Sequence, residues 1–355
     1  MTLRVGLLGL GEIYPAHLAG YRKLPDDVSI VAVCDANPKK AAEVGLELGA
    51  RSYTDYRELF SSKTIDAVDI MLPHHLHEAA VAAAIEADLH VLVEKPAAPT
   101  ERAVAALQEA ARNRRVMLAV AENTRFSEAY LVVRDLLQSG KIGKVEMVRT
   151  LICGNETHRL QATSNWKGRK SGTLGGAIFD AGAHSFYLLN WLFEGVDTLL
   201  ASASIRTPDS EVEDFAIVLG TLNNGADFVT EYTFTAEIPW NERLEVYGSQ
   251  GSVIVDQLAD PVVKAFYGKR NENGEDQGAW LNDWDGQGIG DVPYRPLHWK
   301  QESISGEVVD FVRAVVDDRP HKVSLVDVRA AMLAIEAAYD SIAAGSTRVA
   351  VGRPS

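Results

Sequence analysis

Over residues 3–121, short apolar segments alternate with longer alanine-rich segments, and this alternation constrains the fold more than any other feature. The apolar segments are almost continuously hydrophobic, as in parallel strands that are buried on both faces. The expected strands are Arg4–Leu8, Ile30–Cys34, Ala67–Leu72, His90–Val93 and Val116–Ala119. The segments between them, such as "PKKAAEVGLELG" and "HEAAVAAAIEAD", have helical periodicity. The pattern predicts an α/β domain with a doubly wound parallel sheet over residues 1–121.

The pattern changes after Glu122. A helix is expected near residues 176–193, and six short β-type segments follow between residues 198 and 266. "LNNGA" and "YGSQGS" are hairpin signals between them, which favours a large, mainly antiparallel sheet and an α+β domain over residues 122–355. Residues 268–300, rich in Gly, Asn, Asp and Trp, are expected to form a long functional or mobile loop. Two final helices, near 302–317 and 324–344, are candidates to pack back on the first domain.

The composition limits the partners. A length of 355 residues suits two domains, and a net charge of −14 argues against nucleic acid or an anionic membrane as the main partner. No apolar run approaches the roughly 20 residues that span a bilayer, and no signal peptide is visible, so a cytoplasmic protein is expected. The two cysteines, Cys34 and Cys153, are expected to be buried apolar residues rather than a disulfide or a metal pair.

A glycine-rich turn follows the first expected strand. Gly9 and Gly11 in "VGLLGLGEIYPAH" would let the backbone approach a pyrophosphate at a helix N-terminus. Asp35 closes the second strand, where a carboxylate can bind both ribose hydroxyls and repel a 2′-phosphate, so NAD is favoured over NADP. The two lysines of "NPKK" weaken that preference, and a plain strand-end carboxylate is the alternative. The third fingerprint position is Tyr14, so helix packing there must differ from the usual case.

Three histidines in "LPHHLHEAA" invite a zinc hypothesis, because imidazole is a common zinc ligand. No cysteine is near, and the nearest carboxylate, Glu78, would start a helix. We therefore expect no metal, and instead a loop that faces the cofactor and caps the next helix.

The segment "HVLVEKPAAPT" ends an apolar strand with Glu94, Lys95 and Pro96. A strand end that reaches solvent would tolerate these residues, and that is the plain interpretation of an isolated EKP. In a doubly wound sheet, however, ligands bind outside the carboxyl ends of the strands. Lys95 would then face a bound ligand rather than bulk water.

With "GLGEIYPAH", "VCDANP", "LPHHLH" and "VLVEKP" in this order, the chain resembles the Gfo/Idh/MocA family of glucose–fructose oxidoreductase-like and inositol dehydrogenase-like enzymes. The resemblance continues through "AENTRF", "GKIGKV", "GGAIFDAGAHSFYLLNWL" and "YGSQGSVIVD", and is weakest over 255–300. It implies a Rossmann domain, a C-terminal domain with a large open sheet, and a homodimer or homotetramer built on that sheet. It also implies NAD(P)-linked oxidation or reduction of a sugar, cyclitol or related polyol.

The resemblance assigns Lys95, Asp180 and His184 as catalytic residues. Asp180 and His184 lie at i and i+4, on one face of the expected helix; a hydrogen-bonded core histidine is the alternative. The expected cofactor-binding residues are Gly9, Gly11, Glu12, Ile13, Asp35, Leu72, Pro73, His77, Glu94, Lys95 and Asn123. The expected substrate-binding residues are Lys95, Asn123, Arg125, Trp166, Asp180 and His184. Glu94 would contact the nicotinamide side and hold Lys95, and a cis Lys95–Pro96 bond would fix the backbone.

Oxidation of a secondary alcohol needs a base for the hydroxyl proton and a cation for the developing alkoxide. His184 suits the first role, because its free pKa lies near neutrality. Lys95 suits the second, and such electrostatic help contributes on the order of 3–4 kcal/mol per donor. Asp180 would either orient His184 or bind a neighbouring hydroxyl.

Several positions leave alternatives open. Many relatives carry an Asp where this chain has Tyr187, which could fill core space or alter which hydroxyls are gripped. Gly175 and Gly176 are expected to leave space beside a ligand. The loop residues that could cover the substrate are His158, Tyr294, His298 and Trp299.

Two other functions remain open beside the NAD-dependent dehydrogenase. An enzyme on the same scaffold could oxidise a sugar transiently, eliminate the aglycone and reduce the ring again, so that the net reaction is glycoside cleavage. A non-catalytic dinucleotide-binding protein is the second alternative.

Overall fold

The computed structural model describes residues 2–161, 165–260, 262–267, 273, 279–281 and 301–354. The chain forms two compact units. Unit 1 contains Met1–Arg125, Ser171–Leu174 and Lys300–Arg329, and unit 2 contains Phe126–Lys170, Gly175–Trp299 and Ala330–Ser355. A segment between two helices of unit 2 therefore belongs to unit 1.

Unit 1 is built on a six-stranded sheet in the order β3-β2-β1-β4-β5-β6, and all its strand pairs are parallel. The order reverses between β1 and β4, as in a doubly wound sheet, so the predicted fold class is confirmed. The strands are β1 Leu3–Leu8, β2 Val28–Cys34, β3 Arg51–Tyr53, β4 Ala67–Ile70, β5 His90–Glu94 and β6 Leu118–Ala121. The sequence did not predict β3, because three residues with two exposed side chains carry little hydrophobic signal.

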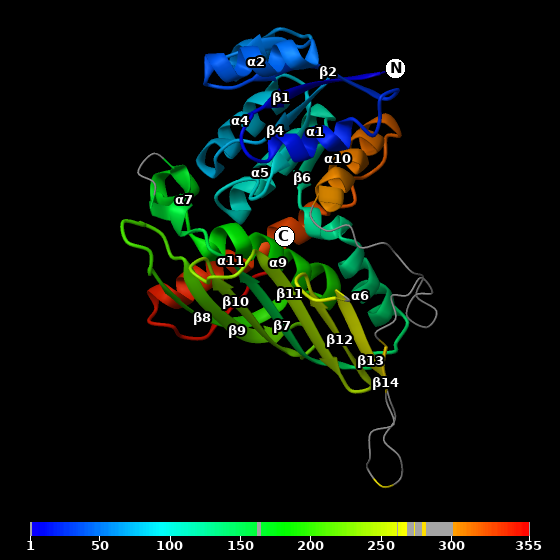
Figure 1. Ribbon diagram of the computed structural model, residues 1–355, viewed down its shortest axis with the longest axis vertical. Coiled ribbons are helices and arrows are strands. Elements are labelled where there is room, and N and C mark those ends of the chain that lie inside the picture. The colour runs from blue at the N-terminus through cyan, green and yellow to red at the C-terminus, as the bar shows by residue number, and fades with distance from the viewer. Residues whose placement is uncertain are drawn as a thin grey trace. The chain divides into compact units, whose positions relative to one another are not determined.

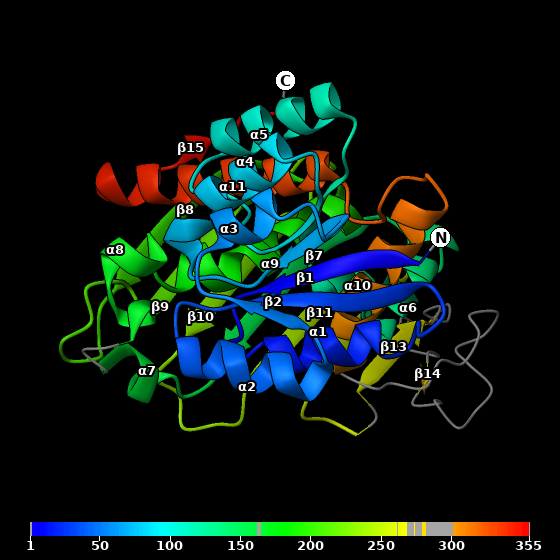
Figure 2. The same ribbon diagram turned by 90° about the horizontal axis from the view of Figure 1, so that it is seen from above.

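Helices cover both faces of this sheet (Figures 1 and 2). They are α1 Tyr14–Tyr21, α2 Pro38–Leu48, α3 Tyr56–Ser61, α4 His74–Glu86, α5 Glu101–Arg114 and α10 Gln301–Val316. Polar side chains begin three of them: Asn37, Asp55 and Thr100 each accept a backbone N–H in the first turn. Although α10 is far away in the sequence, it packs against α1, and Val308 and Phe311 join the core beside β1.

Unit 2 contains a nine-stranded sheet in the order β14-β13-β12-β11-β7-β10-β9-β8-β15. All pairs are antiparallel except β7 with β10, so the prediction of a mainly antiparallel sheet is confirmed. Its strands are β7 Val145–Cys153, β8 Val196–Ser204, β9 Phe215–Leu222, β10 Asp227–Thr233, β11 Asn241–Gly248, β12 Gly251–Asp256, β13 Val263–Tyr267, β14 Ala279–Leu281 and β15 Val349–Ala350.

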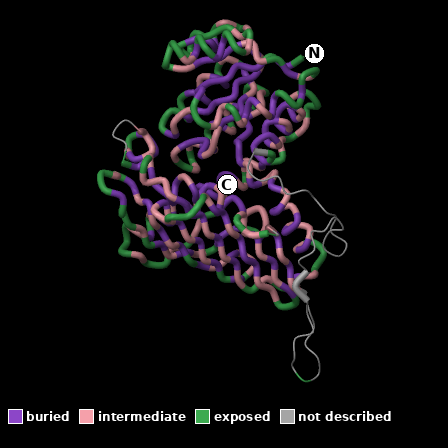
Figure 3. Tube along the Cα trace, in the orientation of Figure 1, coloured by how far each residue is buried: buried purple, intermediate pink, exposed green. Residues whose placement is uncertain are grey.

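In unit 2, helix α9 Ala177–Phe193 packs against β8, β9 and β10, and helix α6 Glu128–Gln138 packs against β12 (Figure 1). The unit also contains α7 Thr157–Gln161 and a short 3₁₀ turn η2 at Trp166–Gly168. Three elements contain residues of both units: α8 Lys170–Thr173, α11 Leu325–Ala343 and the 3₁₀ turn η1 at Asn123–Phe126. In β9, side chains such as Val218 are buried, whereas the alternate residues are half-buried or exposed (Figure 3). This alternation is that of an antiparallel sheet with one open face.

Two further expectations concern burial. Cys34 and Cys153 are both free and buried, as predicted, and burial raises the pKa of Cys34 to about 12, so its thiolate is disfavoured. Within the described residues, the helices are all too short or too polar to cross a bilayer. Most of the predicted 268–300 loop lies outside the described residues.

The close packing of α1 on α10 yields a stability prediction. A Cβ added at Gly20 would lie 2.7 Å from Cβ of Val308, whereas one added at Gly182, in α9, would have no neighbour closer than 3.4 Å. Gly20→Ala should therefore lower the free energy of unfolding by about 1–3 kcal/mol through overpacking. Gly182→Ala should leave it unchanged or raise it by up to about 1 kcal/mol, because alanine favours helix. Urea unfolding of both variants tests this, and equal effects would contradict the packing argument.

Candidate active site

The turn after β1 is shaped for close backbone approach. Gly9 has a positive φ of 89°, and an added Cβ would lie 2.5 Å from the Met71 carbonyl oxygen, so a side chain is excluded there. Gly11 is exposed, and an added Cβ would meet nothing within 4 Å. The first glycine thus makes the turn, and the second leaves open space where a pyrophosphate can approach.

The residues beside this turn also suit a dinucleotide. Helix α1 starts directly after it, and its N-cap, Ile13, provides no side-chain cap for the first N–H groups. Pro15 has no N–H, and the N–H groups of Ala16 and His17 donate to the Ile13 carbonyl, so within the first turn the N–H of Tyr14 remains for an anion. Glu12 is exposed and Ile13 is half-buried, so both border the turn. Tyr14, at the third fingerprint position, packs against the hydrophobic core instead of leaving room for close helix–strand contact.

Asp35 ties the turn to the end of β2. Its Oδ2 accepts the backbone N–H of Leu10 at 2.9 Å, and its Oδ1 accepts that of Asn37 at 2.8 Å. The carboxylate is therefore fixed at the edge of the sheet, beside the glycine turn. Each oxygen keeps further lone pairs, which can accept hydroxyl donors of a ribose.

The three histidines after β4 do not form a loop, because α4 already begins at His74. Each of them faces a backbone carbonyl. His74 and His75 contact the carbonyl oxygens of Thr173 and Gly172, at 3.2 and 2.9 Å, which fastens the segment 171–174 to unit 1. Carbonyl partners therefore account for the histidine cluster that invited a zinc hypothesis.

His77 links the ends of β4 and β5. Its Nε2 lies 2.7 Å from the carbonyl oxygen of Leu72, and its Nδ1 lies 2.7 Å from that of Pro96. Burial lowers the pKa of His77, although both carbonyls favour a protonated ring. With both ring nitrogens engaged by the backbone, His77 shapes the cofactor side of the sheet by holding these strand ends. Leu72 and Pro73 are half-buried at the same edge.

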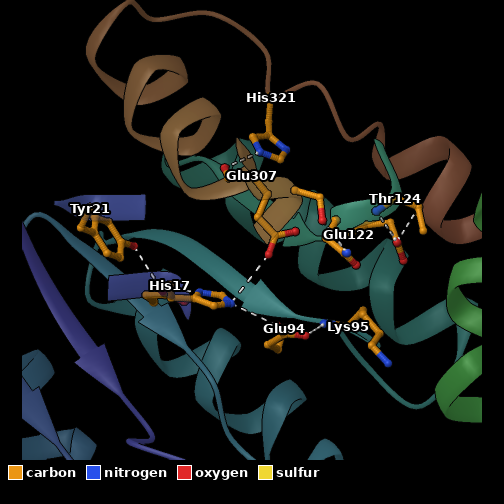
Figure 4. Close-up of polar contacts among 11 residues, drawn as sticks. His17, Tyr21, Glu94, Lys95, Glu122, Thr124, Glu307 and His321 are labelled. Atoms are coloured by element: carbon orange, nitrogen blue, oxygen red, sulfur yellow. Dashed lines mark hydrogen bonds and ion pairs between the residues drawn. The ribbon is translucent and has the colours of Figure 1, made fainter. Parts of the chain in front are cut away.

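The EKP tripeptide closes β5. The Lys95–Pro96 peptide bond is cis, in agreement with the sequence-based expectation. Oε2 of Glu94 accepts the backbone N–H of Lys95 at 3.1 Å. The Lys95 side chain extends away from the Glu94 carboxylate (Figure 4). Glu94 therefore holds Lys95 through its backbone and leaves the ammonium directed elsewhere.

A buried acidic cluster lies behind Glu94, and sequence reasoning missed it. His17, in α1, is fully buried, with Nδ1 2.8 Å from Oδ2 of Asp69 and Nε2 3.1 Å from Oε1 of Glu94. Oε1 of Glu307, from α10, lies 3.7 Å from the same Nε2. Tyr21 donates its hydroxyl to Oδ2 of Asp69 at 3.1 Å (Figure 4).

The charges in this cluster shift its pKa values. Burial opposes the charged form of His17, but Asp69 and Glu94 outweigh it, so the pKa of His17 lies well above its usual value. Burial also raises the pKa of Glu94, but the hydrogen bond and charge of His17 are stronger and lower it overall. Glu307 has no such bond, and burial raises its pKa well above the usual range. The cluster thus favours the charged forms of His17 and Glu94 and the neutral form of Glu307.

In unit 2, helix α9 carries the predicted acid–base pair. From residue 177 to residue 189, every side chain is buried except those of Asp180 and His184. Their i, i+4 spacing places them on one face, which is the open face of the helix. Nζ of Lys167 lies 3.8 Å from Oδ2 of Asp180 and 5.8 Å from the ring centroid of Trp166, so Lys167 is a further polar neighbour that the sequence did not reveal.

Two expectations about α9 need comment. The glycine pair before it does not leave space for a ligand: a Cβ at Gly176 would overlap the carbonyl oxygen of Glu213, and one at Gly175 would overlap the hydroxyl of Tyr339. That expectation is wrong, because the glycines allow close packing within unit 2. Tyr187, at the position where many relatives carry Asp, is 1% exposed and fills the core.

The other predicted site residues each have different neighbours. Nδ2 of Asn123 donates to the Ser303 hydroxyl at 2.9 Å, within unit 1. Arg125 lies near Asp327: burial raises the pKa of that carboxyl, and Arg125 partly offsets the shift. His158 is exposed on α7. Tyr294, His298 and Trp299 lie outside the described residues.

Together, the parallel sheet, the glycine turn and the carboxylate at the end of β2 define a dinucleotide-binding protein of the oxidoreductase class. Two family models match the chain: the oxidoreductase family with an NAD-binding Rossmann fold over residues 3–122, and the GFO/IDH/MocA C-terminal domain over residues 130–254. The chain therefore belongs to the Gfo/Idh/MocA oxidoreductase family, and its cofactor is NAD.

Curated proteins and solved structures are similar to this chain. It is 26% identical over 347 residues to a myo-inositol 2-dehydrogenase of Thermotoga maritima, and this alignment covers 96% of each chain. It is 31% identical over 266 residues to a dTDP-3,4-didehydro-2,6-dideoxy-α-D-glucose 3-reductase of Saccharopolyspora spinosa, covering 73% of this chain and 76% of the relative. A solved levoglucosan dehydrogenase in complex with NADH and L-sorbose has a TM-score of 0.86, at 24% identity and 99% coverage of both chains, and so shares the fold.

The raised pKa of Glu307 yields a pH prediction. His17, Glu94, Glu122 and Asp69 face this carboxyl, and only His17 favours its ionised form. Because the pKa is raised in the folded protein, folding takes up a proton above the usual pKa of about 4.5, and stability falls as the pH rises towards the raised value. Glu307→Gln lacks this dependence.

As the pH rises, the wild type should therefore lose stability relative to Glu307→Gln. The loss is at most about 1.4 kcal/mol per pH unit, the free energy of a one-unit pKa shift. Urea unfolding between about pH 5 and pH 8 measures it. Parallel stability curves would show that Glu307 is ionised in the folded protein.

Proposed function

We propose that the protein is an NAD-dependent dehydrogenase that transfers a hydride between nicotinamide and a secondary alcohol of a sugar, a cyclitol or a sugar derivative. The observation that carries the proposal is the open face of α9, on which Asp180 and His184 alone interrupt a run of thirteen otherwise buried positions, residues 177–189. The names of the relatives support the substrate class, since they specify oxidoreduction of an inositol and of a dideoxyglucose derivative.

In this proposal His184 removes the proton of the substrate hydroxyl, and a hydride leaves the carbon that bears this hydroxyl, so the alcohol becomes a ketone. NAD, when bound, supplies the hydride acceptor. Lys95 donates to the same oxygen and stabilises its negative charge, which is the kind of electrostatic help that often dominates catalysis. In the reverse reaction His184 returns the proton. Lys95 is suited to this role because Glu94 fixes its backbone and leaves the side chain directed away.

We assign Asp180 to orienting His184 or to binding a neighbouring hydroxyl. Lys167, 3.8 Å from Asp180, supports the second role, because the pair would present a donor and an acceptor to adjacent hydroxyls. Trp166 adds an aromatic face beside Lys167, suited to the apolar side of a sugar ring.

NAD is proposed over NADP on the basis of Asp35. Its carboxylate is held by two backbone N–H groups, so it cannot turn away easily from a 2′-phosphate. The remaining cofactor contacts are assigned to the turn at Gly9–Ile13, to Leu72 and Pro73, and to Glu94, Lys95 and Asn123.

A homodimer or homotetramer is proposed through the open face of the nine-stranded sheet, in a cytoplasmic protein. That face combines apolar side chains with an ionic network. Leu219 is 37% exposed on β9, and Arg149 on β7 lies 3.0 Å from Glu231 and 3.5 Å from Glu245. A half-exposed apolar sheet with charges that are already paired suits burial against a second copy.

Variants of the two proposed catalytic residues test the mechanism. Lys95→Ala and His184→Ala should each lower kcat by about 100-fold or more, because each loses a group that acts on the reacting oxygen. Thermal stabilisation by NAD should persist in both, and serves as the control for folding and cofactor binding. Near-normal turnover in either variant would exclude that residue from catalysis.

The substrate is found by NADH absorbance with a panel of inositols, aldoses, uronates and glycosides, using NAD and NADP in parallel. Net NADH formation with a free polyol is the expected result. Release of an aglycone without net NADH would indicate redox-neutral glycoside cleavage instead. NAD binding without any turnover would indicate a non-catalytic protein.

The interface has its own test. Leu219→Glu should convert the oligomer to a monomer, because an added carboxylate on the apolar face opposes its burial. Leu46→Glu is the control, since Leu46 is 87% exposed on α2 in unit 1 and should leave the oligomer intact. Light scattering after size-exclusion chromatography measures both. A monomeric wild type, or an unchanged oligomer in Leu219→Glu, would exclude this interface.

A further inference from the structure

A continuous chain of hydrogen bonds leads from α1 to the backbone of Lys95. Tyr21 donates to Asp69, Asp69 accepts from His17, and Glu94 accepts from His17 through Oε1 and from the Lys95 N–H through Oε2. The members come from α1, β4 and β5, and Glu307 approaches from α10 (Figure 4). Three secondary-structure elements are thereby tied to one peptide group, that of the proposed catalytic lysine.

His17 is the centre of this chain. Its ring is fully buried, and its two nitrogens bond to two different carboxylates. A neutral imidazole has one N–H and could donate to only one of them, whereas an imidazolium donates to both. Two buried carboxylates facing an uncharged ring would be strongly unfavourable. With both partners ionised, only the charged ring satisfies both contacts.

Glu94 depends on this cation for its position. Its side chain is 16% exposed, and its two oxygens face opposite ways: Oε1 towards His17 and Oε2 towards the Lys95 N–H. Oε1 of Glu307, at 3.7 Å from Nε2 of His17, lies beyond hydrogen-bond distance. The Nε2 N–H of His17 therefore donates its hydrogen bond to Glu94. Without His17, nothing among the described contacts would hold Oε1 in place.

We propose that His17 is a positioning residue for Lys95: its imidazolium locks Glu94 between α1 and the Lys95 backbone, and so fixes where β5 presents the lysine side chain. The inference rests on the proposed function, because it matters for turnover only if Lys95 acts on the substrate. A misplacement of about 1 Å in a catalytic group can lower a rate by about 100-fold, so a residue without substrate contact can control kcat.

His17→Gln tests the proposal, because its amide can bond to one carboxylate but not carry a charge to both. We expect kcat to fall by about 10- to 100-fold, and the dissociation constant of NAD to change by a smaller factor, because the glycine turn and Asp35 still bind the cofactor. The acid limb of the kcat–pH profile should move to higher pH, because Glu94 loses the partner that lowers its pKa.

His90→Gln is the matched control. His90 lies at the opposite end of the same strand, β5, and its Nδ1 accepts the backbone N–H of Met117 at 3.0 Å. The control should lose stability without a change in kcat or in the pH profile. Equal effects of both variants, or an unchanged kcat in His17→Gln, would overturn the positioning role.

A second measurement does not depend on turnover or on a folded variant. The ¹⁵N NMR signals of His17 in the wild-type protein should show both ring nitrogens protonated at neutral pH, and a neutral ring would overturn the inference. If this signal is as expected but no polyol is oxidised, the proposed function is wrong and the inference about His17 stands.

Potential ligand atoms of His17, Glu94 and Glu307 also lie within 4.8 Å of one another. An increase in thermal stability with Zn²⁺ or Mn²⁺ that EDTA reverses would show that a metal ion binds between these residues, and would overturn the inference of a doubly protonated His17.

Discussion

The site in unit 1 depends on two contacts of the buried His17 ring, one with the carboxylate of Asp69 and one with that of Glu94. Asp69 lies in the middle of β4 and is fully buried, a position that an unpaired carboxylate could not occupy without a large desolvation penalty. His17 offsets that penalty and at the same time orients Glu94. The same charge thus allows a carboxylate in the centre of a parallel sheet and fixes the end of the neighbouring strand.

Around this cluster, the carboxyl ends of the parallel strands are held by side chains rather than left to loop conformation. Asp35 fastens the glycine turn to β2, His77 bridges the ends of β4 and β5, and Glu94 fastens Lys95. Each of these contacts joins a backbone group to a neighbouring strand end. A dinucleotide approaching this edge therefore meets a surface that is already organised, which reduces the ordering that binding requires.

Much of this fold could be predicted from the sequence, because near-continuous apolar strands alternating with amphipathic helices admit few topologies. The glycine turn, Asp35 and the EKP tripeptide could also be found, since each lies beside a strand end. The His17 cluster could not, because a single histidine in an apolar helix is usually a core residue. Asp69 in "AVDIML" was the available signal: a charge inside a buried strand needs a partner, but the sequence does not say that α1 and α10 supply its surroundings.

The glycine pair before α9 shows the opposite error. Small residues beside the helix of the proposed acid–base pair suggested room for a ligand, yet the Glu213 backbone and Tyr339 occupy that space. The Glu213 carboxylate accepts the N–H groups of Gly176 and Ile178, so it caps α9 and sets where the helix begins. The absence of a Cβ at Gly176 therefore permits the close contact with Glu213 that caps the helix of the proposed acid–base pair, Asp180 and His184.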